Sequence, residues 1–146
     1  TPIYEDIIGN FKNINLLEIG IANGCSLKAW SYYYPNSKIT GIDINPNCAL
    51  LCEDNDKINI IISDVLEYDF DEKYDVIIID APCSAVGTIR RNPEIFFKNK
   101  SPNFNELISL QKNMIEKASI LLNENGIIIY MVCSFNKYGI FLTTKS

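Results

Sequence analysis

The chain has 146 residues, 47% hydrophobic and 21% charged, a composition typical of one globular domain with its own core. It contains no histidine, which excludes histidine-based catalytic triads and most zinc sites, and its net charge of −5 disfavours a free nucleic-acid-binding protein. Five cysteines without a regular framework indicate reduced thiols, and no segment resembles a signal peptide or a membrane span. We therefore expect a single cytoplasmic domain over residues 1–146, with no membrane partner.

Strands and helices alternate along the sequence. In chain order, we predict a strand over 14–24, a helix over 25–34, a strand over 38–45, a helix over 46–55, a third strand from residue 58, a fourth over 74–82, a helix from Ser101 to the turn at 123–126, and a fifth strand over 126–135. Four consecutive aliphatic residues favour a central position for the fourth strand. The alternation predicts an α/β fold with a doubly wound, mostly parallel, Rossmann-like sheet.

An acidic residue stands towards the end of each of the first two predicted strands, and another follows the third. Sheets of this kind bind ligands at the carboxyl ends of their strands, where carboxylates can accept hydrogen bonds from ribose hydroxyls or an adenine amino group. Glycines in the turn after the first strand would let backbone amides approach such a ligand. The candidate cofactor-binding residues are Glu18, Gly20, Ala22, Gly24, Asp43 and Asp64.

Two cofactors share this pattern, NAD and S-adenosylmethionine. The dinucleotide fingerprint needs a third glycine to bring the helix amino end to a pyrophosphate, and here Gly20 and Gly24 are followed by none. The spacing therefore favours S-adenosylmethionine. The alternative is that these glycines and acids only form turns, with Asp64 capping the turn that follows it.

The second half of the sequence carries more specific motifs. Asp-Ala-Pro-Cys-Ser stands at 80–84, Gly-x-x-x-Arg-x-Pro at 87–93, Leu-Gln at 110–111 and Tyr-x-x-Cys-Ser at 130–134. In this order the motifs resemble the Sun/Fmu (NOL/NOP/Sun) family of RNA cytosine-5 methyltransferases. The resemblance covers 74–135 closely and 16–70 more loosely.

The resemblance implies an enzyme that methylates carbon 5 of cytosine in rRNA or tRNA, with S-adenosylmethionine as cofactor. Cys133 would be the nucleophile that adds to carbon 6, because a thiolate there turns carbon 5 into an enamine-like nucleophile. Cys83 would act in product release, and Asp80 would hydrogen-bond near the base and the cofactor. Arg90 and Arg91 match the arginine motif and would bind an RNA phosphate.

Plainer interpretations of the same residues stay open. Free cysteines are usually small buried hydrophobes, as we interpret Cys25, Cys48 and Cys52, and the two arginines also suit a solvated turn. The first glycine turn is more like that of small-molecule methyltransferases. Two rival functions remain: a small-molecule or protein methyltransferase, and a subunit that binds the cofactor without turnover.

The sequence also departs from the family pattern. Val132 stands where threonine is usual, and the family's flanking segments do not appear between Thr1 and Ser146. We therefore expect a piece truncated at both ends, with a sheet that lacks the last strands. Since its net charge is −5, we also expect it to need an RNA-binding segment or partner.

Overall fold

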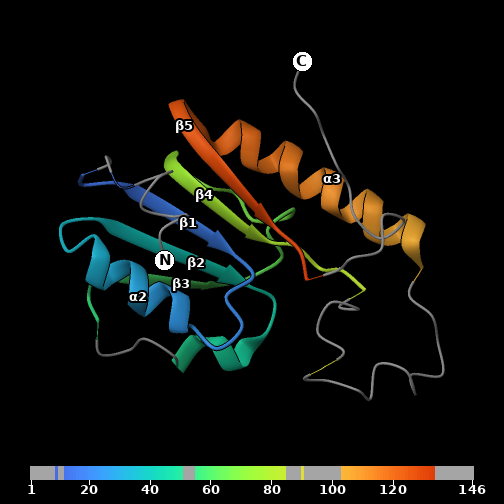
Figure 1. The fold of residues 1–146 in the computed structure, drawn as a ribbon, viewed down its shortest axis with the longest axis horizontal. Helices are drawn as coiled ribbons and strands as arrows, with labels where there is room; N and C mark the ends of the chain where they lie inside the picture. The colour runs from blue at the N-terminus through green and yellow to red at the C-terminus, as the bar shows by residue number, and fades with distance from the viewer. Residues whose placement is uncertain (1–8, 10–11, 51–54, 85–89, 91–102, 134–146) are drawn as a thin grey trace.

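The computed structural model describes residues 9, 12–50, 55–84, 90 and 103–133 (Figure 1). Its elements in chain order are β1 (Asn15–Ile19), α2 (Cys25–Tyr33), β2 (Lys38–Asp43), the 3₁₀ helix η1 (Pro46–Leu50), β3 (Ile58–Ile62), β4 (Tyr74–Asp80), α3 (Phe104–Leu121) and β5 (Leu122–Met131). Among the described helices, none combines the length and apolar character that a membrane crossing requires.

The five strands form one parallel sheet in the order β3-β2-β1-β4-β5. The chain adds β2 and β3 on one side of β1, then returns to add β4 and β5 on the other. β4 lies inside the sheet, as predicted, although β1 takes the middle position. The strand order reverses between β1 and β4, and in open parallel sheets this is where the ligand crevice lies. The predicted doubly wound, Rossmann-like fold is confirmed.

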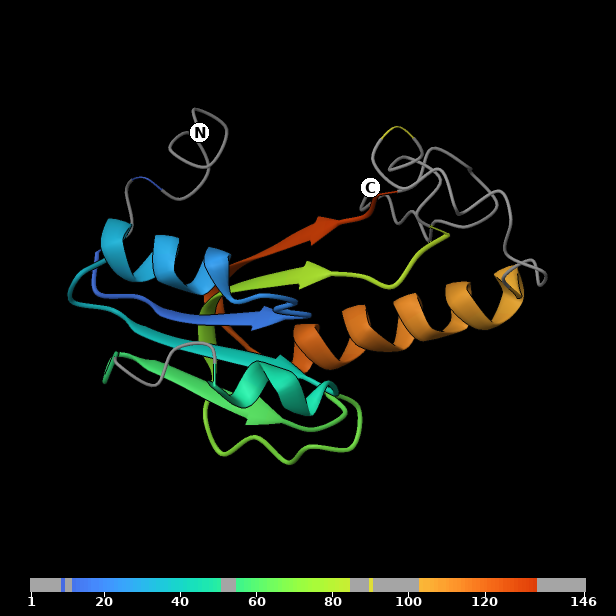
Figure 2. The same ribbon diagram turned by 90° about the horizontal axis from the view of Figure 1, so that it is seen from below.

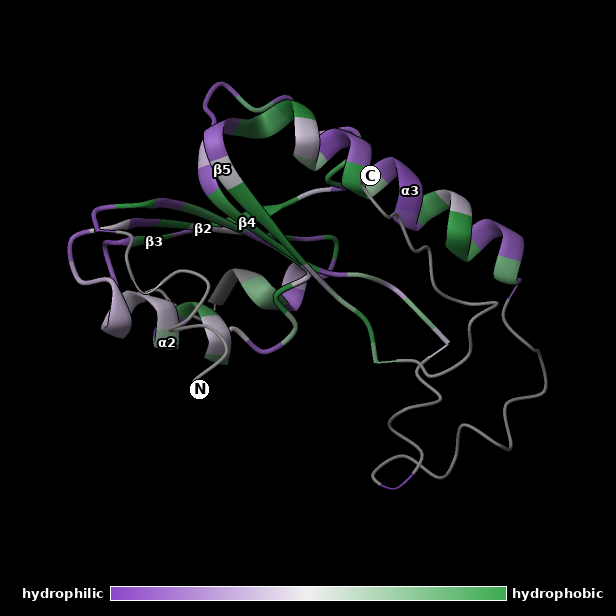
Figure 3. Cartoon of the chain, turned by 45° about the horizontal axis from the view of Figure 1, so that its top comes forward, coloured by the Kyte–Doolittle hydropathy of each residue, from purple (hydrophilic) through white to green (hydrophobic). Residues whose placement is uncertain are grey.

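Helices cover both faces of the sheet, which explains why the strands read as continuous aliphatic runs. Figure 2 shows α2 and α3 on opposite sides of the strands. The residues of β4 from Val76 to Ile79 are all fully buried. Figure 3 shows hydrophobic colouring along β4 and β5, while α3 alternates between hydrophilic and hydrophobic positions, as a helix with one buried face does.

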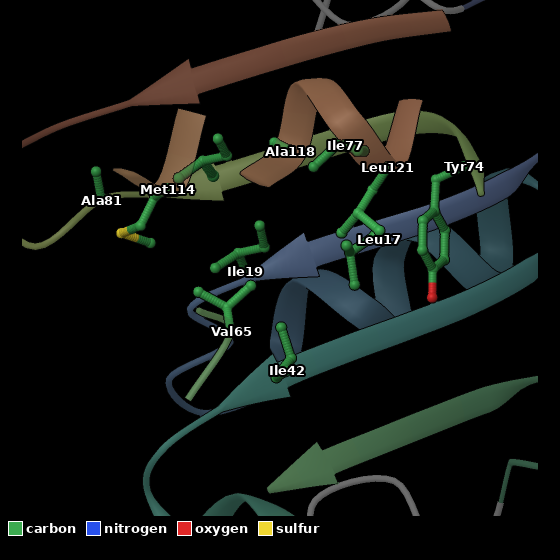
Figure 4. Close-up of a cluster of buried hydrophobic side chains, with 11 residues drawn as sticks. Leu17, Ile19, Ile42, Val65, Tyr74, Ile77, Ala81, Met114, Ala118 and Leu121 are labelled. Atoms are coloured by element: carbon green, nitrogen blue, oxygen red, sulfur yellow. The ribbon is translucent and has the colours of Figure 1, made fainter. Parts of the chain in front are cut away.

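Each face has its own hydrophobic cluster. On the α2 side, Leu27 and Trp30 pack with Leu16 of β1 and Val76 of β4. On the α3 side, shown in Figure 4, the helix residues Met114, Ala118 and Leu121 join residues of the sheet. The sheet and loop members of that cluster are Leu17, Ile19, Ile42, Val65, Tyr74, Ile77, Ile79 and Ala81. This packing docks α3 along β4 and brings Met114 to the cleft at the carboxyl end of that strand, where the predicted site lies.

Several predicted boundaries differ from the structure, among them the first strand, which ends at Ile19 rather than Gly24. The helix expected over 46–55 is a 3₁₀ helix ending at Leu50, and 51–54 lie outside the described residues. The cap of α3 is Asn103, whose side-chain oxygen accepts hydrogen bonds from two backbone amides of the first turn, whereas Ser101 lies outside the described part.

The last strand begins earlier than predicted, at Leu122. This residue already pairs with Tyr74 of β4, so the expected turn at 123–126 becomes an irregularity in the pairing, with Asn125 at a φ of 63°. Residues 134 and 135, the predicted end of this strand, lie outside the described residues.

Candidate active site

A cleft of about 250 Å³ opens at the carboxyl ends of β1 to β4. Four residues predicted from the sequence line it: Gly20, Asp43, Asp64 and Asp80. The remaining lining residues are Ile19, Ile42, Ile44, Ser63, Val65, Pro82, Leu110 and Met114. The cleft thus has three carboxylates at its rim and a largely apolar wall, which suits a ligand with both a sugar and a flat base.

Gly20 is where β1 turns towards the cleft, and only glycine fits there. Its φ is +84°, in the left-handed region, and a Cβ at this position would lie 2.8 Å from the backbone oxygen of Asp80. The Gly20 amide donates to the Ile42 carbonyl at 2.9 Å. The turn is therefore fastened to β2 and packed against the end of β4, and no side chain stands between the strand ends and a ligand.

Asp43 holds the glycine turn in place. Its Oδ2 accepts hydrogen bonds from the amides of Ile21 at 3.0 Å and Ala22 at 3.2 Å, and its Oδ1 accepts one from the Asn45 amide at 2.9 Å. Ala22 and Gly24 belong to this turn but do not line the cleft. Their contribution is the backbone shape, since both have positive φ values.

Glu18 differs most from its predicted place. It is only 3% exposed and does not line the cleft. Its Oε1 accepts from the Ser26 hydroxyl at 2.6 Å and its Oε2 from the Trp30 indole N–H at 3.1 Å. Burial raises the pKa of Glu18, the two hydrogen bonds lower it, and the Asp80 carboxyl raises it again. Glu18 joins β1 to α2 behind the cleft.

Asp64 lies where a ligand could reach it and also caps a turn. It lies in the cleft wall, and its Oδ1 also accepts a hydrogen bond from the Leu66 amide at 2.9 Å, as a turn-capping aspartate does.

The two cysteines of the sequence motifs converge. Cys83 and Cys133 lie 50 residues apart in the chain, yet their Sγ atoms are 3.7 Å apart. The pairing of β4 with β5 explains this, because Asp80 lies opposite Met131 and the Ala81 amide donates to the Met131 carbonyl at 3.0 Å. The segments that follow β4 and β5 therefore leave the sheet side by side, next to the Asp80 end of the cleft.

The Cys133 thiol lies among groups that favour its protonated form. Burial raises the pKa of the Cys133 thiol, and the neighbouring Cys83 thiol and the Asp80 carboxyl raise it further. Burial also raises the pKa of Asp80. The Tyr130 hydroxyl is buried and has no hydrogen-bond partner in the described part of the chain, and burial, with a contribution from Cys83, raises its pKa to about 12. The Cys133 sulfur is therefore held mainly in its thiol form.

Of the two arginines predicted to bind phosphate, the structure describes only Arg90, which does not line the cleft. Arg90 is exposed, and Arg91 lies outside the described residues. Sequence reasoning missed the cleft residues Leu110 and Met114. The i, i+4 spacing of the pair on one face of α3 was the available signal. That this face reaches the cleft depends on how α3 docks.

The family model for the 16S rRNA methyltransferase RsmB/F matches residues 35–138. The chain belongs to the RsmB/F family. The resemblance noted in the sequence is confirmed, and with it the methyltransferase class and the cofactor, S-adenosylmethionine. The RsmB/F match includes β2 to β5 and both motif cysteines.

Curated relatives of the RsmB/F chain agree with the family match. This chain is 40% identical over 62 residues to ribosomal RNA small subunit methyltransferase B of Pasteurella multocida (strain Pm70), and the match covers 42% of this chain and 14% of that protein. It is 41% identical over 64 residues to the protein of the same name from Yersinia pseudotuberculosis serotype O:1b, covering 44% and 15%. The chain thus spans about a seventh of the length of these relatives.

Solved structures agree with the fold of the RsmB/F chain. The crystal structure of PH0851 superposes with a TM-score of 0.81 at 22% identity, over 93% of this chain and 33% of that one. TrmN from Thermus thermophilus superposes with a TM-score of 0.65 at 14% identity, over 90% and 36%.

The residues of the cleft fit the cofactor of this family. Gly20 keeps the strand ends free of side chains, and Asp43 and Asp64 bring carboxylate oxygens to the second and third strand ends, where ribose hydroxyls and an adenine amino group can donate. When bound, S-adenosylmethionine supplies an electrophilic methyl group on a sulfonium. Leu110 and Met114 would form the apolar wall beside it.

Proposed function

We propose that the chain forms the catalytic core of an enzyme that methylates carbon 5 of cytosine in RNA, with an rRNA or tRNA as substrate. The observation that carries this proposal is the 3.7 Å separation of the Cys83 and Cys133 sulfurs beside the cleft. One thiol suffices for adduct formation, so two converging thiols suit a reaction that must both form and break a carbon–sulfur bond.

In the proposed reaction, the Cys133 thiolate adds to carbon 6 of cytosine, and the electron pair of the 5,6 double bond moves to carbon 5. Carbon 5 then takes the methyl group, the bond from that methyl to the sulfonium sulfur breaks, and S-adenosylhomocysteine is left. A base removes the proton from carbon 5, the double bond re-forms, and the Cys133 sulfur leaves as a thiolate. We assign Cys83 to this release step, and Asp80, whose carboxyl lies in the cleft wall, to hydrogen bonding with the cytosine ring.

The charge of the chain bears on how RNA would bind. With a net charge of −5, this domain lacks the positive charge that phosphate binding requires. We propose that an RNA-binding segment or partner supplies it, with Arg90 and Arg91 contributing locally. Because the chain spans 14% to 15% of its curated relatives, the substrate and partners of the whole protein are likewise proposals.

The assignment is tested with single-cysteine variants and RNA that contains ordinary cytosine, whose carbon 5 keeps the proton that release requires. Cys83→Ala should accumulate an RNA–protein adduct whose mass maps to the peptide of Cys133, and Cys133→Ala should form none. Cys25→Ala is the matched control, because this exposed cysteine at the start of α2 lies outside the cleft lining. Since the pKa of Cys133 is raised, adduct formation should speed up as the pH rises above neutral.

Other outcomes would select the rival functions. If both Cys83→Ser and Cys133→Ser keep full methyl transfer, the covalent mechanism is wrong and a small-molecule or protein substrate is favoured. If S-adenosylhomocysteine binds but no methyl transfer occurs with an added RNA-binding domain, the chain is a cofactor-binding subunit without turnover.

A further inference from the structure

Gln111 is a fully buried polar residue on the face of α3 that packs against the sheet. It is 0% exposed, between the cleft residues Leu110 and Met114. Its Nε2 donates a hydrogen bond to the Pro82 carbonyl at 2.8 Å, across 29 residues of sequence. A buried amide costs stability unless it is hydrogen-bonded, and a Leu or Met would fill such a place without that cost. The contact with Pro82 therefore points to a role beyond packing.

The hydrogen bond acts on the peptide unit that begins Cys83. The Pro82 carbonyl and the Cys83 amide share one planar peptide group, so holding the oxygen sets the direction in which the Cys83 backbone leaves. Pro82 has no N–H with which to join the strand ladder. Just before it, the Ala81 amide is held by the Met131 carbonyl of β5 at 3.0 Å. The segment after β4 is thus anchored from β5 at residue 81 and from α3 at residue 82.

We propose that Gln111 is a positioning residue, which holds Cys83 opposite Cys133 through the Pro82 carbonyl. The same helix turn carries Leu110 and Met114 into the cleft, so the position of α3 sets the cofactor wall and the thiol pair together. The assignment of a release step to Cys83 rests on the proposed function, whereas the spacing of the two thiols does not.

The first test measures thiol spacing without RNA. Phenylarsine oxide condenses with two neighbouring thiols, forming two As–S bonds and releasing one water, and mass analysis identifies the Cys83 peptide bridged to the Cys133 peptide. Gln111→Met keeps the side-chain volume but cannot donate, and we expect it to slow bridging by about tenfold, as loss of one net hydrogen bond predicts. Ala118→Gly is the matched control: it weakens a fully buried position of α3 about two helical turns beyond Gln111, and bridging should stay at the wild-type rate.

Gln111→Glu provides a rescue. A protonated glutamate can donate to the Pro82 carbonyl and an ionised one cannot, so the bridging rate relative to wild type should fall as the pH rises. A wild-type rate in Gln111→Met, or an equal loss in Gln111→Met and Ala118→Gly, would overturn the positioning role.

The second test adds the RNA substrate. Gln111→Met should form the Cys133 adduct at close to the wild-type rate but release it more slowly, so that the adduct accumulates as it does in Cys83→Ala. Accumulation no greater than in wild type, despite slowed bridging, would overturn the link from Gln111 to release. If wild-type protein forms no adduct while bridging still depends on Gln111, the proposed function fails and the positioning of Cys83 stands.

Discussion

Replacing Gly20 with alanine tests the idea that the turn after β1 must carry no side chain. Alanine at a φ of +84° costs about 1 to 2 kcal/mol, because its Cβ approaches the following carbonyl oxygen. The new Cβ would also lie 2.8 Å from the Asp80 backbone oxygen, so one of the two segments must move. The 2.9 Å hydrogen bond from the Gly20 amide to the Ile42 carbonyl opposes that movement, and losing it costs about 1 kcal/mol.

We therefore expect Gly20→Ala to lower the free energy of unfolding by about 2 to 3 kcal/mol, measured by urea denaturation. Displacement of Asp80 should also weaken binding of S-adenosylhomocysteine by about tenfold, measured by calorimetry. Gly24→Ala is the matched control, since its φ of +67° imposes a similar backbone strain away from the cleft lining. If the two variants bind the ligand equally well, the argument that Gly20 shapes the cleft is wrong.

Three further substitutions test the packing and charge around the site. Trp30→Phe removes the indole donor from the buried Glu18 carboxylate and should cost about 1.5 to 3 kcal/mol in urea denaturation followed by circular dichroism; a loss below about 0.5 kcal/mol would contradict the role of this hydrogen bond. Glu18→Gln should gain stability relative to wild type as the pH rises from about 4 to about 8. The reason is that a carboxyl whose pKa is raised on folding stabilises the fold below its unfolded pKa, and this contribution is lost as the pH passes its folded pKa. Parallel stability curves for the variant and wild type would refute this prediction. Met114→Ala, at a position only 6% exposed, should cost about 2 to 5 kcal/mol and weaken S-adenosylhomocysteine binding, and an unchanged affinity would show that α3 does not form the cofactor wall.

The fold could largely be predicted from the sequence because its signals are local. Four aliphatic residues in a row at 76–79 indicate a strand covered on both faces, and their burial in the structure bears this out. The carboxylates of Asp43 and Asp64 could also be placed at the cleft, because their positions relative to the predicted strands are a local signal. Asp43 lies near the end of the second predicted strand and Asp64 follows the third, and the carboxyl ends of parallel strands meet at one edge of the sheet.

The direction in which individual side chains face was decided only by tertiary packing. In β1 both faces are buried, so alternation could not tell whether Glu18 faces the cleft or α2. The answer depends on Ser26 and Trp30, which α2 brings to its two oxygens. The same holds for Gln111, whose partner carbonyl lies 29 residues away and is reached only once α3 has docked on the sheet.

Sequence alone thus determined the fold class, a doubly wound parallel sheet, together with the family and the identity of the two motif cysteines. These follow from local periodicity and from motifs in a given order. The 3.7 Å approach of the two sulfurs and the wall that α3 adds to the cleft came from the tertiary structure. Both arise from contacts between segments far apart in the chain, which depend on how β4, β5 and α3 pack together rather than on what any one of them contains.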